Sequence, residues 1–270
     1  GIFEPAVTGT GRLSSREPNL QNLPTFGEWS KRVKEGLQPH GEDRMFVAAD
    51  YSQIELRILA HLCGDKRLLD AFASGRDIHT ETASWVFSTE PAFVTPELRR
   101  VAKMINFGLL YGMSAFGLAQ RLAIGRQEAS DIVKRYFEAL PGVKEYLDAG
   151  YIEAKERGYT RTVAGRIRPL AEVSVSPRDR DALRRVAVNT PIQGSAADIA
   201  RKAMVDFARR FPKEGSVRLA LQVHDSLVCE CARDEAPAVE SELVKIMEGA
   251  ATLSVPLKVE AKKGGNLAEV

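Results

Sequence analysis

Two apolar, strand-like runs that each end in an aspartate constrain this chain more than any other feature. Residues 46–49 lead into Asp50, and residues 219–223 lead into His224 and Asp225. The second run continues beyond this point, which predicts a β-hairpin with His224 and Asp225 at its turn. Strands of one sheet bring carboxylates from distant parts of a sequence side by side, where a pair of Mg²⁺ ions relieves their repulsion. Taken separately, each aspartate also fits an ordinary turn residue.

A segment between the two aspartates predicts a helix with a chemically graded stripe. Residues 99–112 contain no proline, and four side chains recur at every fourth position, namely Arg99, Lys103, Phe107 and Tyr111. The stripe is about 18 Å long, cationic at one end and aromatic at the other. A nucleoside triphosphate has the same polarity, which makes it a candidate ligand. Core packing of the two rings and solvent exposure of the two cations is the alternative explanation.

Length and composition exclude several classes of protein. A chain of 270 residues is long enough for one or two domains. It has no apolar run of about 18 residues and no secretory signal at its start, so no membrane partner is expected. The three cysteines, Cys63, Cys229 and Cys231, lack a zinc-ligand spacing and predict simple packing in a reducing compartment.

The net charge of +2 conceals a segregation of charge along the chain. Residues 157–185 carry eight arginines against three acids, a balance of +5, whereas residues 230–248 carry six acids against two bases, a balance of −4. This pattern predicts one face that follows a phosphate backbone and another that faces solvent. A solvated helix face is the alternative for the basic stretch.

Periodicity and breaker residues predict a mixed order of elements. The first 40 residues read as turns and irregular pieces. Residues 65–159 read as mostly helical. Further helices are expected over 53–62, 177–188, 195–210 and 235–252. A small hairpin is expected over 161–173 and a final strand over 257–259. The 177–188 helix is expected to stop near residues 189–191, which include Pro191.

Together these segments make the chain resemble the family A DNA polymerases, the group that contains bacterial DNA polymerase I. Residues 50–57 match the first motif of that family, residues 99–112 its nucleotide-binding helix, and residues 222–225 its second carboxylate motif. Their order and spacing agree, residues 10–15 and 19–24 fit as well, and the resemblance covers essentially the whole chain.

The resemblance implies an α+β fold of two parts. The first is a polymerase palm, an antiparallel sheet with packed helices, formed by residues 1–62 and 191–270. The second is a mostly helical fingers insertion formed by residues 63–190. The thumb and the 3′–5′ exonuclease domain of relatives are expected to be absent from this chain, which begins at the palm without methionine and so resembles a fragment of a longer protein.

The same resemblance implies a template-directed DNA polymerase that adds deoxynucleotides to a primer 3′-hydroxyl and releases pyrophosphate. Two Mg²⁺ ions, for which Mn²⁺ substitutes, would be held by Asp50, Asp225 and the backbone carbonyl of Tyr51, and Lys103 would complete the catalytic set. The expected nucleotide-binding residues are Gln53, Glu55, His79, Arg99, Lys103, Phe107 and Tyr111. The expected DNA-binding residues are Arg12, Gln21, Asn22, Arg185, Asn189, Gln193 and His224.

Two of these positions, and one neighbouring residue, have a specific interpretation. Glu55 resembles the steric gate that rejects ribonucleotides and accepts a hydrogen bond from Tyr111, with a helix surface charge as its alternative. His79 would assist at the β- and γ-phosphates, although its position also fits a residue at a helix start. Ser226 departs from the glutamate that many relatives carry after the second aspartate, which puts the role of that carboxylate in doubt.

The expected partners are primer–template DNA, deoxynucleoside triphosphates (dNTPs) and the thumb and exonuclease region of the same parent protein. The expected location is the cytoplasm of a bacterial or phage-like source, or an organelle of a eukaryote. A non-catalytic DNA-binding module and a two-metal nuclease are the competing functions. Reverse transcription, and the choice between replication and repair, are left open by these residues.

Overall fold

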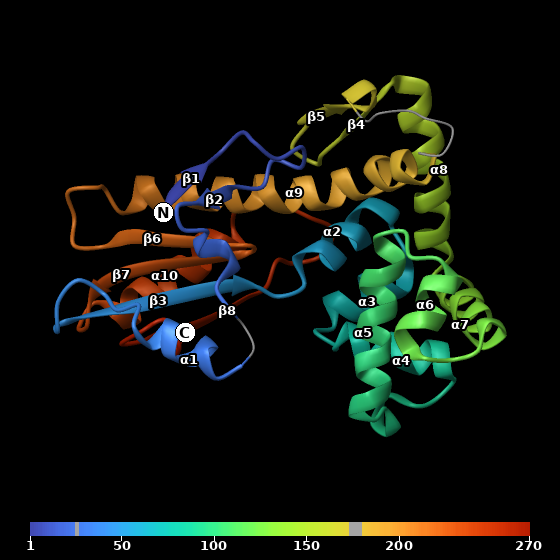
Figure 1. The fold of residues 1–270 in the computed structure, drawn as a ribbon, viewed down its shortest axis with the longest axis horizontal. Coiled ribbons are helices and arrows are strands. Elements are labelled where there is room, and N and C mark those ends of the chain that lie inside the picture. The colour runs from blue at the N-terminus through green and yellow to red at the C-terminus, as the bar shows by residue number, and fades with distance from the viewer. Residues whose placement is uncertain (25–26, 173–179) are drawn as a thin grey trace. The chain divides into compact units, whose positions relative to one another are not determined.

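The computed structural model describes residues 1–24, 27–172 and 180–270 and divides them into two compact units (Figure 1). Unit 1 comprises residues 1–54, 193–252 and 257–270. Unit 2 comprises residues 55–192 and 253–256. Each unit is therefore assembled from segments that are distant in the sequence.

Unit 1 is organised around a four-stranded antiparallel sheet with the strand order β6-β7-β3-β8. Its strands are β3 (Arg44–Tyr51), β6 (Arg218–Val223), β7 (Ser226–Ala232) and β8 (Val259–Gly264). Helix α10 (Ala236–Glu248) packs against β3, β7 and β8. The unit also contains a separate strand pair, β1 (Ile2–Glu4) with β2 (Ser14–Arg16), helix α1 (Glu28–Glu35) and the second part of helix α9 (Arg180–Arg210).

Alternation along β3 gives the sheet two different faces. Phe46 packs with Val228 and Leu267 on one face. Tyr51 points to the other face, where its hydroxyl donates a hydrogen bond of 2.7 Å to the carbonyl of Met247 in α10. Asp50 has the same parity as Phe46, so its side chain lies on the face opposite α10.

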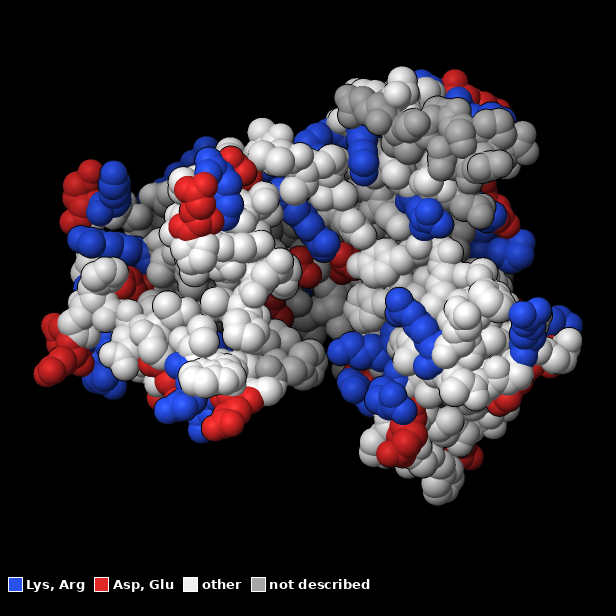
Figure 2. All heavy atoms as spheres, viewed as in Figure 1, with Lys and Arg blue, Asp and Glu red and all other residues white. Residues whose placement is uncertain are grey.

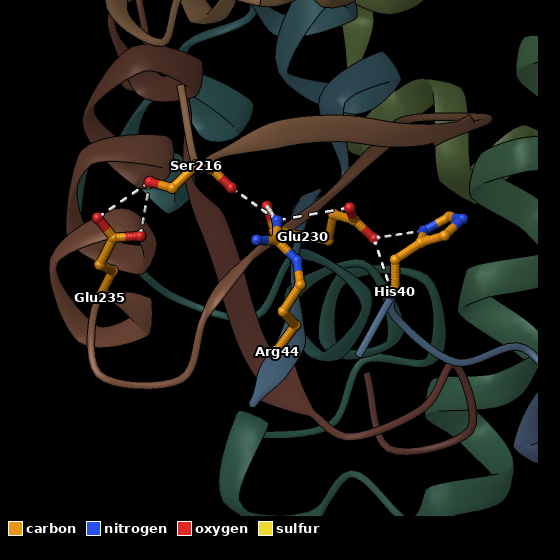
Figure 3. A network of polar contacts seen from close by, with 5 residues as sticks. All are labelled: His40, Arg44, Ser216, Glu230 and Glu235. Atoms are coloured by element: carbon orange, nitrogen blue, oxygen red, sulfur yellow. Dashed lines mark hydrogen bonds and ion pairs between the residues drawn. The ribbon is translucent and has the colours of Figure 1, made fainter. Parts of the chain in front are cut away.

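A polar network fixes the start of β3 (Figure 3). Glu230 of β7 is only 5% exposed and lies 3.4 Å from the Arg44 guanidinium and 3.2 Å from Nδ1 of His40. Partial burial raises the pKa of Glu230, but the hydrogen bonds from His40 and the charge of Arg44 outweigh it, so the pKa lies below its ordinary value. Arg44 also donates to the carbonyl of Ser216. These contacts stabilise the pairing of β3 with β7 at the end of β3 that is remote from Asp50.

Unit 2 is mostly helical. Helix α4 packs against α3, α5 and α7, and α7 packs against α6 and α8. The elements are α2 (Ile54–Cys63), α3 (Lys66–Ala73), α4 (Ile78–Phe87), α5 (Pro96–Leu110), α6 (Ala115–Leu122), α7 (Arg126–Ala139), α8 (Pro141–Arg157), the hairpin β4 (Tyr159–Arg161) with β5 (Ile167–Pro169), and the first part of α9. The α+β class predicted from the sequence is confirmed.

The position of α2 differs from the division expected at residues 62 and 63. The structure groups Glu55 and the rest of α2 with unit 2. The reason is visible at Arg57, whose guanidinium lies 4.6 Å from the centroid of the Phe72 ring of α3. Arg57 also donates a 2.8 Å hydrogen bond to the carbonyl of Pro256, which explains why the short segment 253–256 belongs to the same unit.

The expectation that a helix stops at Pro191 is wrong. Helix α9 continues from Arg180 to Arg210 with Pro191 inside it. A proline has no N–H to donate to the carbonyl four residues earlier, which here is that of Ala187. The Thr160 hydroxyl of β4 donates to this carbonyl at 3.0 Å, so the buried acceptor is satisfied without the helical bond.

Other expectations are corrected or confirmed element by element. The first 40 residues contain helix α1, which was not predicted. The last strand, expected over 257–259, extends from Val259 to Gly264. The helix expected over 235–252 ends at Glu248. The hairpin at Asp225 and the helix after Asp50 are confirmed. Part of the arginine-rich stretch, the start of the 177–188 helix and residue 173 of the small hairpin lie outside the described residues. Within the described ranges, no helix has both the length and the apolar character needed to cross a bilayer.

Candidate active site

The two predicted carboxylates lie together at one end of the sheet in unit 1. Asp50 is paired in register with Ser226 of β7 on one side and with Glu260 of β8 on the other. Asp225 directly precedes Ser226, and its carbonyl accepts a 3.2 Å hydrogen bond from the backbone N–H of Tyr51. The β3–β7 ladder therefore holds these aspartates at adjacent positions, as the sequence predicted.

The electrostatics of this edge favour a cation. Loss of water contact and then the charge of Glu260 raise the pKa of Asp50, while nearby His224 opposes that shift. Asp225 lies 4.0 Å from the guanidinium of Arg12, a residue that the sequence analysis assigned to DNA. The negative charge of the edge is thus only partly compensated by the protein itself.

The oxygen donors at this edge suit Mg²⁺. Across residues 1–24, 27–172 and 180–270, no group of three or more His, Cys, Asp or Glu side chains has the geometry of a metal site. The edge offers two carboxylates and neighbouring backbone carbonyls, all of them oxygen donors. Mg²⁺ prefers oxygen ligands and takes few of them from protein, so these residues fit the ion.

Two residues beside the carboxylates have a strained backbone. Gln53 has φ 55° and His224 has φ 52°, both in the left-handed region that favours glycine. His224 forms the two-residue turn of the β6–β7 hairpin with Asp225. Side chains kept at a conformational cost are common at functional sites.

Two other DNA-binding candidates of unit 1, Gln21 and Asn22, lie beside the same turn. The side-chain amide of Gln21 donates a 2.8 Å hydrogen bond to the side chain of Gln222, which belongs to the 222–225 motif but was not expected to contact DNA. Gln21, Asn22 and His224 line a cavity of about 450 Å³. Gln193 belongs to the part of α9 in unit 1 and is half-buried.

Unit 2 holds the predicted triphosphate-binding side chains of α5. Arg99 and Lys103 are exposed on this helix, and Figure 2 shows basic side chains gathered over it. Phe107 lies beyond them, with its ring centroid 6.4 Å from that of Tyr111 and 5.9 Å from that of His79. The stripe predicted from the sequence is therefore present, cationic and then aromatic.

Asp77 is a partner of this stripe that the sequence analysis missed. Its carboxylate accepts two hydrogen bonds from Arg99, of 3.0 and 2.7 Å, and a third of 2.7 Å from the backbone N–H of Thr80 at the start of α4. Partial burial raises the pKa of Asp77, but these bonds outweigh it and bring the pKa to about 2. The sequence signal that could have identified Asp77 was its place at the start of a helix, where aspartate commonly caps backbone N–H groups.

His79 is 3% exposed and contacts Asn106, a second residue whose role was not predicted from the sequence. Its Nδ1 lies 3.1 Å from the side-chain nitrogen of Asn106, which is 1% exposed. Burial first, and the charges of Arg99 and Lys103 to a smaller extent, lower the pKa of His79 to about 4, although Asp77 opposes them. The imidazole is therefore neutral at pH 7.

Glu55 and Tyr111 form the contact that the resemblance implied. Glu55 is 5% exposed, and the Tyr111 hydroxyl donates a hydrogen bond to its Oε2. The alternative of a helix surface charge is inconsistent with this burial. Beyond Tyr111, Gly112 has φ 78°, and a Cβ there would lie 2.9 Å from Cγ of Arg185. Arg185 and Asn189 line a separate cavity of about 400 Å³ with Gly112.

Several arginines of the arginine-rich stretch make ion pairs or hydrogen bonds within unit 2. Arg157 lies 3.2 Å from Glu153, and Arg184 lies 2.6 Å from Asp148. Arg168 donates a 3.0 Å hydrogen bond to the Thr190 hydroxyl. These described arginines therefore have structural contacts besides any they make to nucleic acid.

Comparison with known proteins agrees with this geometry. A family model described as DNA polymerase family A matches residues 1–269. The chain is 48% identical to DNA polymerase I of Bacillus caldotenax and 46% identical to the thermostable DNA polymerase I of Thermus aquaticus. Each match covers 97% of this chain but only 30% and 31% of the respective relative.

A solved structure extends the comparison to the fold. The POL domain of Pol1 from M. smegmatis, in complex with DNA primer-template and dNTP, matches with a TM-score of 0.91 and 43% identity. That match covers 99% of this chain and 47% of the other. The fold is thus that of a polymerase domain. The chain belongs to DNA polymerase family A.

Proposed function

We propose that this chain is the palm and fingers portion of a template-directed DNA polymerase. Its substrates are primer–template DNA and dNTPs. The observation that carries the proposal is the register of β3 against β7, which sets Asp50 beside Asp225. Unit 1 corresponds to the palm and unit 2 to the fingers.

The reaction joins the primer 3′-oxygen to the α-phosphorus of a dNTP. The bond from that phosphorus to the bridging oxygen breaks, and pyrophosphate leaves. Asp50, Asp225 and the carbonyl of Tyr51 would hold two Mg²⁺ ions, which would supply acidification of the 3′-hydroxyl and neutralisation of charge on the phosphates. Glu260, paired with Asp50 in register, adds negative charge to the same edge.

The α5 stripe binds and orients the nucleotide. Lys103 contacts the triphosphate and supplies a proton to the departing pyrophosphate, while Arg99 binds the γ-phosphate and His79 donates to the phosphates. Phe107 stacks near the ribose and Tyr111 closes the base-pair pocket. Gln53 adds a further nucleotide contact. Positioning and charge neutralisation of this kind provide most of the catalysis in phosphoryl transfer.

Arg99 must exchange partners in this scheme. Asp77 already occupies its guanidinium through two hydrogen bonds. A γ-phosphate carries more charge than a carboxylate and accepts from the same planar fork. Asp77 therefore holds the Arg99 guanidinium until the nucleotide arrives.

The polar side chains near the primer terminus test base pairing without reading sequence. Every base pair offers acceptors at purine N3 and pyrimidine O2 in the minor groove. Donors that suit these acceptors are Arg12, Gln21, Asn22, Arg185, Asn189, Gln193 and His224. The absence of sequence discrimination suits a polymerase and not a regulator.

Primer extension by the Asp225→Asn variant tests the proposal. We expect extension to fall by about 100-fold or more, because the variant removes a charge that stabilises the transition state. The matched control is Asp234→Asn, in which the same chemical change falls just beyond the other end of β7. Equal extension by Asp225→Asn and the parent chain would instead favour a DNA-binding module.

The nuclease alternative is tested in the same preparation. Labelled duplex is incubated with Mg²⁺ and no nucleotides. A polymerase without nuclease activity leaves the duplex intact, whereas degradation that Asp225→Asn abolishes would assign the carboxylates to hydrolysis. The exposed cations of α5 favour the polymerase, since a nuclease has no use for a triphosphate site.

A further inference from the structure

Asn106 lies behind His79 on the buried side of α5 and has no place in the function proposed above. Its amide nitrogen lies 3.1 Å from Nδ1 of His79 and 3.0 Å from Oγ1 of Thr82. An amide nitrogen carries two hydrogens, and these two atoms are its two acceptors. The orientation of the amide therefore decides which nitrogen of His79 carries a proton.

Thr82 is the second acceptor of this amide nitrogen. Its hydroxyl is 2.8 Å from the carbonyl of Ile78, one helical turn earlier, and 3.2 Å from the side-chain oxygen of Asn106. A hydroxyl has one hydrogen, and the shorter contact to the carbonyl of Ile78 takes it. The lone pairs of Thr82 Oγ1 then accept from the amide nitrogen of Asn106, which at 3.0 Å is the nearer of the two amide atoms.

The orientation of the Asn106 amide sets the protonation of the His79 imidazole. With the amide nitrogen of Asn106 directed at Nδ1, that ring nitrogen must be the acceptor. A neutral imidazole with an accepting Nδ1 carries its hydrogen on Nε2. We propose that Asn106 is a positioning residue that holds His79 as the neutral Nε2–H tautomer, so that a phosphate oxygen receives a neutral N–H donor instead of an imidazolium. This inference rests on the proposed phosphate role of His79.

The charged groups around His79 are consistent with a neutral ring. Arg99 and Lys103 of α5 disfavour a third positive charge, and Asp77, which favours it, is occupied by Arg99. The pKa of about 4 keeps His79 neutral throughout pH 6 to 8. A neutral donor has a further advantage, because its hydrogen bond does not change with pH in this range.

The tautomer is measured on the unaltered chain by ¹⁵N spectroscopy of the histidine rings. The chain has four histidines, so the spectrum of His79→Gln identifies the His79 signals by their loss. At pH 7 we expect Nδ1 in the range of an unprotonated ring nitrogen and Nε2 in that of a protonated one. The reverse assignment would mean that the Asn106 oxygen faces a protonated Nδ1, and it would overturn the inference without any reference to nucleotide binding.

The isosteric variant Asn106→Asp tests the consequence for binding. A carboxylate cannot donate to Nδ1, so the ring proton moves to Nδ1 at pH 8, and Nε2 loses its hydrogen. We expect dTTP to bind about tenfold to a hundredfold more weakly than to the parent chain at pH 8. At pH 6 the adjacent carboxylate favours the imidazolium, which again carries a hydrogen on Nε2, so the difference between variant and parent should shrink.

Controls separate this inference from the proposed function. Asn266→Asp makes the same change in the described part of unit 1, where the side chain bonds Glu269, and should alter neither the His79 signals nor the affinity ratio. A ratio for Asn106→Asp that is constant from pH 6 to pH 8 would contradict the positioning role. If the parent chain fails to bind dTTP, the proposed function fails, and the ¹⁵N spectrum still decides the tautomer.

Discussion

Asp77 uses one carboxylate for two purposes. It caps α4 through the N–H of Thr80 and pairs with Arg99 through both oxygens. Asparagine is about as good a helix cap as aspartate but carries no charge. The substitution Asp77→Asn therefore isolates the ion pair from the cap.

We expect this ion pair to give stability that depends on pH. The folded pKa of Asp77, about 2, lies below the ordinary value of an unfolded aspartate, about 3.9. The contribution is therefore complete above about pH 4 and is lost as the pH falls towards 2. Because the pair is partly exposed, it is worth about 1 kcal/mol.

Urea unfolding of Asp77→Asn and the parent chain at several pH values measures this effect. The parent should be more stable at pH 7, and the difference should vanish near pH 2. A difference that is the same at both pH values would show that the cap, and not the charge, accounts for it.

Glu55 and Tyr111 give a prediction about sugar selection. Glu55→Ala removes the buried carboxylate from the space that a ribose 2′-hydroxyl would need, so discrimination against ribonucleotides should fall by about tenfold or more. Tyr111→Phe is the control, because it removes the hydrogen bond but leaves the carboxylate. Incorporation of paired ribo- and deoxyribonucleotides measures the ratio, and an unchanged ratio in Glu55→Ala would remove its assignment as a gate.

At the scale of elements, the passage of α9 through Pro191 depends on β4. Thr160 donates to the carbonyl that the proline leaves without a helical partner. Thr160→Val keeps the shape of the side chain but leaves a buried acceptor unsatisfied, which costs about 1–3 kcal/mol.

A double-mutant cycle with Pro191→Ala tests this explanation. Alanine restores the helical N–H, so Thr160→Val should cost less in that background, and the two substitutions should not be additive. Urea unfolding of the four proteins gives the coupling energy. Equal costs of Thr160→Val in both backgrounds would show that the hydroxyl does not replace the helical bond.

Comparison of these elements shows where prediction from the sequence succeeded and where it failed. The β6–β7 hairpin and α5 were predictable, because their patterns, alternation in the hairpin and a four-residue repeat in α5, involve residues that are close together in the sequence. The course of α9 was not, since the compensating Thr160 lies on another element. Asp77 and Asn106 were missed for the same reason: only folding brings them to Arg99 and His79. Helix α1 was missed because it is only eight residues long and none of them is buried, so no core contact marks it in the sequence.

At the scale of the whole molecule, the two units share α9, whose hydrogen-bonded ladder crosses the boundary between residues 192 and 193. Each unit also contributes one of the two tryptophans, Trp29 in unit 1 and Trp85 in unit 2. We expect a single cooperative transition, because loss of either unit removes the support for one half of this helix.

The variants Trp29→Phe and Trp85→Phe each leave one fluorescent reporter. Their urea midpoints should coincide with each other and with the midpoint from circular dichroism. Two separate midpoints would show that the units unfold independently.

The order of strands in unit 1 has a consequence for behaviour at high concentration. Strand β8 is an edge of the sheet, and an edge strand is a template on which another molecule can add a strand. Its exposed side chains are Glu260, Lys262 and Lys263, whose charges oppose the docking of a second copy. We therefore expect these charges to hinder the formation of intermolecular sheets when the protein is concentrated.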